Sequence, residues 1–97
     1  DLIANAAMIQ CQQLGYKVPD EISIIGFDDL PICAYTSPPL TTIRQERIQL
    51  GKSAYYALDS LMNQVSIGTL LLHAKLIERG STGKVPQTNN NIKRTGD

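Results

Sequence analysis

The stretch VPDEISIIGFDD, residues 18–29, carries the strongest indication of the fold. The proline at its second position excludes a continuing helix, because the ring fixes φ and removes an N–H donor. Residues 22–27 are then almost continuously apolar, which is typical of a strand covered on both faces in a parallel sheet. The run stops at Asp28 and Asp29, and ligands of open α/β sheets bind outside the carboxyl ends of the strands. The stretch therefore predicts a buried strand whose end presents carboxylates to a small ligand.

A helix and a second strand are predicted on either side of this stretch. Apolar side chains cover most of the circumference of a helix over residues 2–14, so this helix should be heavily buried, and Gly15 follows as its C-terminal cap. Prolines exclude regular structure over residues 28–39. A second short strand is then predicted over residues 40–43, in which Thr41, Thr42 and Ile43 are β-branched. Helix, loop and strand together make an α/β unit.

The second half of the chain predicts another helix and one more extended segment. A helix over residues 46–65 places its apolar residues on one stripe. Gly51 costs this helix about 1 kcal/mol relative to alanine, which predicts close packing at that point. Alternating apolar residues predict an extended segment over residues 69–79. The composition turns polar from Gly80, and residues 84–97 are predicted to be disordered.

The composition excludes several classes of protein. Ninety-seven residues allow at most one small domain, and nine basic residues balance nine acidic ones, so no bulk charge attracts DNA or an anionic membrane. No apolar run approaches the roughly 18 residues of a membrane span. Cys11 and Cys33 lack metal-type spacing and are expected to be buried apolar fillers. His73 is the single histidine and is expected on a strand surface, so no metal site and no cofactor are predicted.

An ordered set of short motifs resembles the C-terminal part of the LacI/GalR transcriptional regulators. These motifs are DLIA at residues 1–4, the stretch 18–29, PLTTIRQ at 39–45, LG at 50–51, and LIER at 76–79 followed by Ser81 and Thr82. The resemblance implies an α/β fold, the C-terminal fragment of a two-lobed, type I periplasmic-binding-protein-like domain with parallel strands and flanking helices. It implies that residues 1–43 belong to the C-terminal lobe. Residues 44–83 would cross the hinge and supply a helix of the N-terminal lobe.

The same resemblance implies a ligand-responsive transcriptional regulator in the cytoplasm, not an enzyme. A sugar or small metabolite would bind between the lobes and modulate DNA binding by an N-terminal helix-turn-helix that this chain lacks. The implied state is a homodimer or higher oligomer without membrane contact. The alternative is a periplasmic sugar-binding protein of a transporter, which shares the fold. The pairing of LTTI with LIER favours the regulator, and the sequence upstream of Asp1 would discriminate the two.

Two residues are candidates for ligand contact. Asp28 matches the aspartate that accepts hydrogen bonds from ligand hydroxyls in such regulators, and a carboxylate suits this with two acceptor oxygens. Alternatively, Asp28 caps the following turn, while Asp29 is expected to face that turn. Arg47 lies where some sugar-responsive members stack an aromatic side chain on the ligand. It would meet a polar or anionic group of the effector or remain a solvated side chain.

Three further residues are candidates for subunit contact, and no catalytic set is visible. Leu30, Ile32 and Tyr35 align with a segment that helps to form the dimer contact in these regulators, and the first helix is a possible contributor. The alternative for these residues is packing within one chain. General acid–base catalysis needs positioned partners, and Asp28 and Asp29 have none that the sequence reveals. No catalytic residue is therefore predicted.

Overall fold

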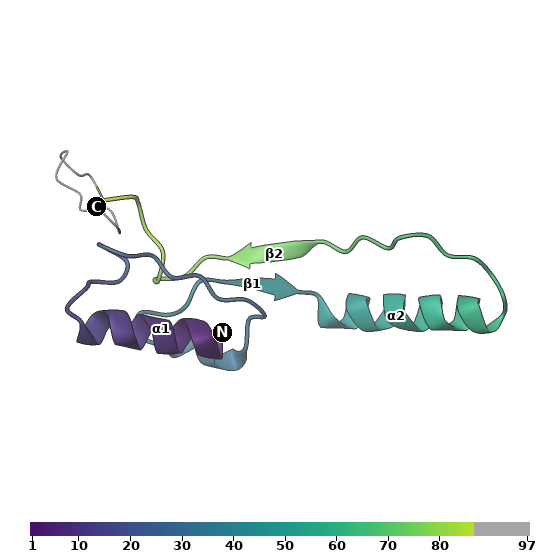
Figure 1. Cartoon of the computed structure of the whole chain (residues 1–97), viewed down its shortest axis with the longest axis horizontal. Coiled ribbons are helices and arrows are strands. Elements are labelled where there is room, and N and C mark those ends of the chain that lie inside the picture. The colour runs from purple at the N-terminus through teal and green to yellow at the C-terminus, as the bar shows by residue number, and fades with distance from the viewer. Residues whose placement is uncertain (87–97) are drawn as a thin grey trace, which may run out of the picture.

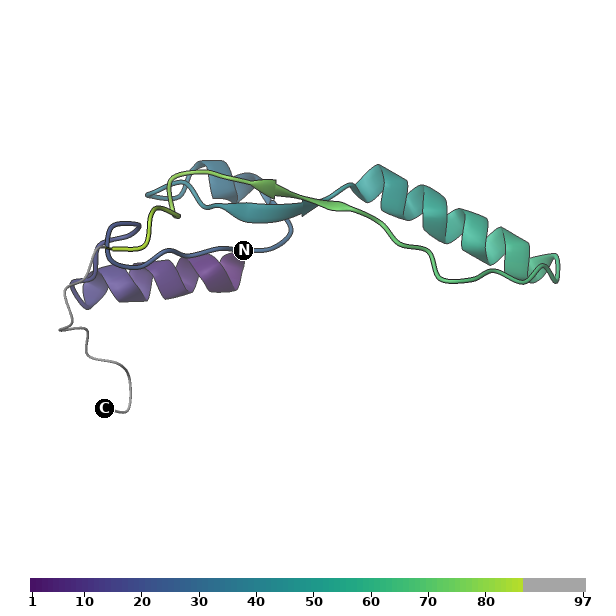
Figure 2. The same cartoon turned by 90° about the horizontal axis from the view of Figure 1, so that it is seen from above.

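The computed structural model describes residues 1–86 and shows an elongated molecule of 61 × 31 × 20 Å. Its elements are the helix α1 (Leu2–Gln13), the 3-10 helix η1 (Pro31–Ala34), the strand β1 (Thr42–Gln45), the helix α2 (Arg47–Met62) and the strand β2 (Ala74–Ile77). Figures 1 and 2 both place α1 and η1 at one end of the molecule and α2 at the other. We call residues 1–41 with 78–86 the body, residues 46–73 the arm, and β1 with β2 the ribbon that joins them.

The ribbon is a two-stranded antiparallel sheet in which Thr42 pairs with Ile77 and Gln45 pairs with Ala74. The predicted strand at 40–43 therefore begins two residues later than expected. The predicted extended segment at 69–79 pairs only over Ala74–Ile77. This return of β2 along β1 brings the chain from the arm back to the body (Figure 1).

The predicted buried strand at residues 22–27 is wrong in extent and in burial. The segment is extended, but it pairs with the residues just before β1 only through a single parallel bridge between Ile25 and Thr41. Ile25 and Phe27 are 56% and 53% exposed, so the segment is not covered on both faces by residues 1–86. Gly26 and Asp28 donate their N–H groups to carbonyls of residues 41 and 43, at 2.8 and 2.7 Å. These bonds still place Asp28 at the edge of the ribbon.

Both predicted helices form, but neither is buried as expected. α1 ends in a Schellman motif, because Gly15 has φ of 94° and donates to Gln12 while Tyr16 donates to Cys11. Met8 is its one buried residue, so the expectation of a heavily buried helix is wrong. α2 is shorter than predicted and buries only Ser60. A Cβ at Gly51 would meet open space, so the predicted close packing there is also wrong. The arm extends away from the body, which leaves these faces uncovered by residues 1–86.

The core of the body is small, and half of its buried side chains are polar. Its fully buried side chains are those of Met8, Cys33, Leu40, Thr41, Thr42 and Ser81. Ser81 joins the two segments around it, because its Oγ accepts from the Thr41 N–H at 2.8 Å and donates to the Ile24 carbonyl at 2.6 Å. Cys11 and Cys33 are both free thiols; Cys33 is buried as expected, whereas Cys11 is only partly buried. Residues 80–83 are thus part of the fold, which the polar composition after Gly80 did not indicate.

Two sequence predictions concern the ends of the chain and its relation to membranes. Residues 84–86 carry neither helix nor strand, and the rest of the predicted tail, 87–97, lies outside the described residues. Within residues 1–86, no helix combines the length and the apolar character that crossing a membrane requires.

Candidate functional site

The dipeptide Asp28–Asp29 lies where the body meets the ribbon and is held in an unusual backbone conformation. Asp28 has φ of 109° and Asp29 has φ of 52°, a region that few residues other than glycine, asparagine and aspartate adopt. Three consecutive N–H groups hold this loop in place. Asp28 donates to the Ile43 carbonyl at 2.7 Å, Asp29 to Thr42 Oγ1 at 3.2 Å and Leu30 to Asp1 Oδ2 at 2.6 Å.

The carboxylate of Asp29 forms an ion cluster with two arginines. Its Oδ2 accepts from Arg44 Nε at 2.7 Å, and its Oδ1 accepts from Arg79 Nη2 at 2.9 Å. Arg79 also donates from Nη1 to the Leu40 carbonyl at 2.9 Å. The Asp29 side chain is only 9% exposed. The prediction that Asp29 faces the turn is therefore wrong: its positive φ directs the side chain toward the strands, where two guanidinium groups compensate its charge.

These arginines lower the pKa of Asp29 below its ordinary value of 3.8. The hydrogen bond from Arg44 is the largest cause; burial of the carboxyl opposes it, and Arg79 adds a second hydrogen bond and its charge. Both side chains that bond this carboxylate, Arg44 and Arg79, carry a positive charge.

The lowered pKa of Asp29 predicts an acid-dependent loss of stability. Because the folded pKa lies below the unfolded value of 3.8, the stabilisation is complete above the unfolded value and is lost as pH falls through the folded one. Urea unfolding of the wild type and of Asp29→Asn should show a difference in free energy that shrinks as the pH falls from about 5 through the folded pKa of Asp29. Asp20→Asn makes the same change of charge at an exposed residue and serves as the control. A difference for Asp29→Asn that is constant with pH would contradict this assignment.

The two candidates for ligand contact, Asp28 and Arg47, lie next to each other. Arg47 is the first residue of α2, and its Nη2 donates to the Asp28 carbonyl at 2.6 Å and more weakly to that of Asp29 at 3.4 Å. Arg47 therefore contacts the backbone of the loop and not the Asp28 carboxylate. That carboxylate is exposed, and residues 1–86 provide it with no hydrogen bond or ion pair, so the alternative that it caps its own turn is wrong.

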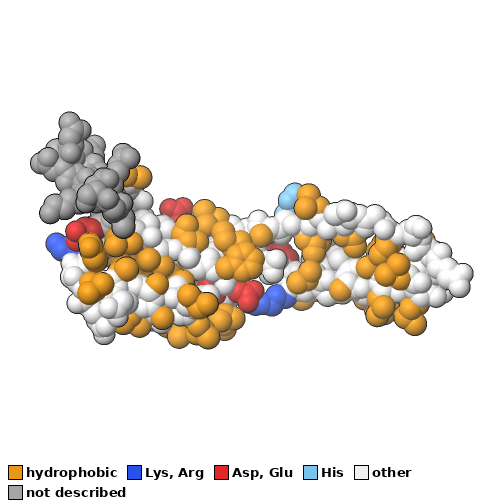
Figure 3. Space-filling model, viewed as in Figure 1, with side chains coloured by type: hydrophobic (Ala, Val, Ile, Leu, Met, Phe, Trp, Pro, Cys, Tyr) orange, Lys and Arg blue, Asp and Glu red, His pale blue; other side chains and the backbone are white. Residues whose placement is uncertain are grey.

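The candidate subunit-contact residues lie on or beside η1. Ile32 is 41% exposed, Tyr35 is 85% exposed, and Leu30 is partly buried. Packing within residues 1–86 therefore accounts for Leu30 but not for Tyr35. Figure 3 shows apolar side chains gathered over the body, and a second group along the arm.

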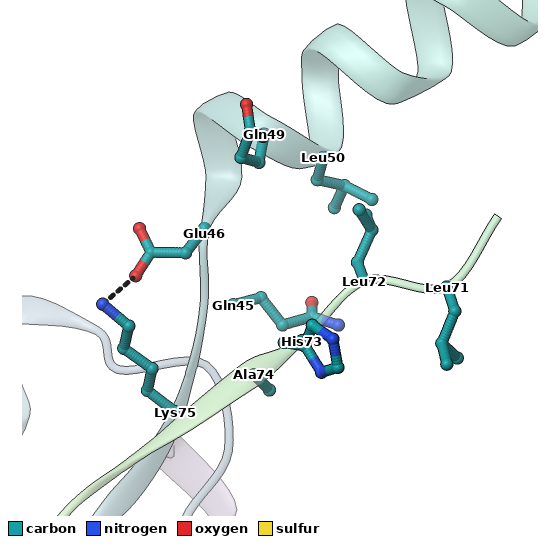
Figure 4. A pocket seen from close by; sticks show the side chains of 9 residues that line it. All are labelled: Gln45, Glu46, Gln49, Leu50, Leu71, Leu72, His73, Ala74 and Lys75. Atoms are coloured by element: carbon teal, nitrogen blue, oxygen red, sulfur yellow. Dashed lines mark ion pairs between the residues drawn. The ribbon is translucent and has the colours of Figure 1, made fainter.

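A cavity of about 350 Å³ lies elsewhere, between the start of α2 and the segment that leads into β2 (Figure 4). Its lining residues are Gln45, Glu46, Gln49, Leu50, Leu71, Leu72, His73, Ala74 and Lys75. Lys75 and Glu46 form an ion pair of 3.4 Å at its edge. Neither Asp28 nor Arg47 lines this cavity, so it is separate from the candidate ligand contacts.

Sequence reasoning missed three residues that build the site. The Asp1 carboxylate connects the loop to β1. Its Oδ1 accepts from Thr42 Oγ1 at 2.7 Å, and its Oδ2 accepts from the Leu30 N–H. A Cβ at Gly26 would collide with Asp1 Oδ1 and lie 2.9 Å from Leu40 Cδ2, so a larger residue there would have to displace one or both of these side chains. Arg79 stands in the LIER motif, but its pairing with Asp29 spans 50 residues. This ion pair could have been predicted only if the pairing register of β1 and β2 had been known.

The fold is that of part of a two-lobed, periplasmic-binding-protein-like domain. Residues 1–82 match the family model described as a periplasmic binding protein-like domain. The chain belongs to this family and, within it, resembles the C-terminal part of the effector domain of LacI/GalR regulators, as its motifs predicted.

Named relatives agree with this assignment. The repressor CytR of Escherichia coli K12 is 42% identical over 88 residues, which cover 89% of this chain and 26% of the repressor. The regulator MalR of Streptomyces coelicolor is 37% identical over 92 residues, with the same two coverages. The chain thus spans about a quarter of the length of these relatives. A lac repressor dimer solved with operator and the anti-inducer ONPF superposes with a TM-score of 0.77 at 34% identity, over 84% of this chain and 25% of that one.

Proposed function

We propose that this chain is the effector-sensing C-terminal portion of a ligand-responsive transcriptional regulator. Residues 1–43 belong to the C-terminal lobe, and residues 44–83 cross the hinge and supply a helix of the N-terminal lobe. A sugar or another small metabolite binds between the lobes and favours one lobe arrangement, which changes operator affinity of an N-terminal helix-turn-helix. The named relatives support this proposal, because CytR and MalR are called a transcriptional repressor and a transcriptional regulator.

The state of the Asp28 carboxylate is the observation that carries the proposal. The N–H groups of the loop and the Asp29 carboxylate are all engaged by residues 1–86, whereas the Asp28 carboxylate is exposed and accepts no bond from them. A loop that is held by several hydrogen bonds and exposes one carboxylate without bonded donors is suited to accept hydrogen bonds from ligand hydroxyls. We assign Asp28 as the acceptor for the effector. Arg47, beside it, is assigned to a polar or anionic group of the same ligand.

A transporter binding protein is the second candidate, and the comparisons favour the regulator. The relatives CytR and MalR are named as a transcriptional repressor and a transcriptional regulator, and the similar lac repressor was solved bound to operator. A regulator of this kind acts in the cytoplasm and has no catalytic group. A signal peptide at the N-terminus of the full-length protein, in place of a helix-turn-helix, would overturn the choice.

We also propose that the full-length protein is a homodimer that uses the surface of η1. Ile32 and Tyr35 are apolar and exposed beside partly buried Leu30, as an isologous contact requires. The dimeric lac repressor supports this assignment by similarity.

Replacing Asp28 by asparagine should weaken effector binding in the full-length protein. Calorimetric titrations use ribose, galactose, maltose, adenosine and cytidine as probes, because each presents several hydroxyls. We expect at least one probe to bind the wild type and to lose affinity by about tenfold or more in Asp28→Asn, since hydrogen bonds to a charged group contribute about 1.5–3 kcal/mol. Asp20→Asn is the matched control and should bind as the wild type does.

Two outcomes would count against the proposal in different ways. If no probe binds the wild-type protein, the class of effector is wrong. If a probe binds the wild type and Asp28→Asn with equal affinity, the role of Asp28 is wrong.

A further inference from the structure

Three guanidinium groups converge on the dipeptide Asp28–Asp29. They belong to Arg44 on β1, Arg47 at the start of α2 and Arg79 just after β2. Within residues 1–86, the chain passes from body to arm through β1 and returns through β2. The loop is therefore bonded to β1, to the segment that follows β2 and to the first turn of α2.

We propose that Asp29 is a positioning residue for the effector site: its ion cluster with Arg44 and Arg79 fixes the loop that presents Asp28. This inference rests on the proposed function and adds to it a separation of roles between two adjacent carboxylates. Asp28 contacts the ligand. Asp29 contacts none, and acts through the backbone that it shares with Asp28.

The backbone conformation of the loop is the first argument for this role. A non-glycine residue in a sparsely populated φ region costs about 1–3 kcal/mol and persists where surrounding contacts determine it. Here the φ of 109° at Asp28 is flanked by bonds from three successive N–H groups and from Arg47 to the Asp28 carbonyl. Within residues 1–86, the Asp29 side chain adds the charge-assisted bond from Arg79 that joins this loop to the segment just after β2.

The different burial of the two carboxylates is the second argument. The Asp29 side chain is 9% exposed and each of its oxygens accepts from a different arginine, at 2.7 and 2.9 Å. An asparagine at this position would keep the size but offer one acceptor oxygen and no charge, so one arginine would face an NH₂ group. Asp28 has no such partners in the described part of the chain and is exposed. The same substitution at the two positions should therefore have different consequences.

Amide hydrogen exchange of the full-length protein separates the two roles without any effector. In Asp29→Asn, we expect the amides of Asp28 and Leu30 to exchange about tenfold faster or more, because a lost bond to a charged group corresponds to at least that factor. In Asp28→Asn, these amides should exchange at the wild-type rate. The amides of α1 report on global stability and should be unchanged in both variants.

A conservative variant provides a rescue measurement. Arg79→Lys retains a positive charge near Asp29, but an ammonium group cannot reproduce the fork that bonds both Asp29 and the Leu40 carbonyl. Its loop exchange should fall between those of the wild type and Arg79→Ala. If Asp29→Asn also accelerates exchange in α1, it destabilises the whole fold and does not report on the loop alone. The milder variants Arg79→Lys and Arg44→Lys then replace it, and they should accelerate exchange at the Asp28 and Leu30 amides but not in α1.

Titration with the probe that binds the wild type completes the test. Asp29→Asn should weaken its binding, and the double variant with Asp28→Asn should be no weaker than Asp28→Asn alone, because both changes act through one carboxylate. Loop exchange in Asp29→Asn equal to that of the wild type overturns this inference alone. Failure of every probe to bind the wild type overturns the proposed function, and the effector role of Asp29 with it.

Discussion

Gly26→Ala should lower the free energy of unfolding by about 3 kcal/mol, the sum of overpacking and of lost hydrogen bonds. A Cβ at this position would collide with Asp1 Oδ1 and lie 2.9 Å from Leu40 Cδ2. Leu40 is fully buried and cannot move away freely. Displacing Asp1 would break the bonds that its carboxylate accepts from Leu30 and Thr42. Urea unfolding followed by circular dichroism measures the loss.

Glycines elsewhere in the chain provide controls for this prediction. Gly51 lies in α2, and a Cβ there would meet nothing within 4 Å. Gly51→Ala should therefore raise the free energy of unfolding, by up to about 1 kcal/mol, because alanine favours the helix. Gly26→Ala with the stability of the wild type would show that the Asp1 contact does not hold the body together.

The 97-residue chain should self-associate, with a mass of at least twice that of the monomer in light scattering. Leu50, Leu58 and Leu61 of α2 are 44%, 58% and 59% exposed and lie on one apolar stripe. Soluble monomers rarely expose continuous apolar patches of this kind, and association removes them from water. The apolar side chains along the arm are visible in Figure 3.

Charged substitutions on this stripe test which surface associates. Leu58→Glu with Leu61→Glu should shift the chain toward the monomer. Gln49→Glu with Gln64→Glu adds the same charge while keeping the leucines, and should leave the mass unchanged. A wild-type monomer with a sharp thermal transition would contradict the prediction.

The sequence indicated the helices well because helices depend on local residues. The glycine after α1 adopts the expected left-handed conformation and completes a Schellman motif. Strand extents were predicted less well, since strand pairing depends on distant partners. The apolar run at 22–27 forms one parallel bridge, and the second strand begins two residues late. The burial of both helices was also overestimated. An apolar stripe indicates that a helix face packs against something, but it does not identify the residues that pack against it.

The candidate site was predicted only where a motif carried it. Asp28 and Arg47 were identified by resemblance, and the structure brings them together through the Asp28 carbonyl. The role of Asp29 could not be inferred, because its partners are 15 and 50 residues away. The same limitation applies to Gly26, whose neighbours Asp1 and Leu40 come close only in the fold.

A crystal structure of the full-length protein with the probe that binds in calorimetry tests the separate roles of the two aspartates most directly. The account predicts an Asp28 carboxylate oxygen within about 3 Å of a ligand hydroxyl, with Asp29 still bonded to Arg44 and Arg79. A ligand that contacts Asp29, or that lies between the lobes without touching Asp28, would contradict it.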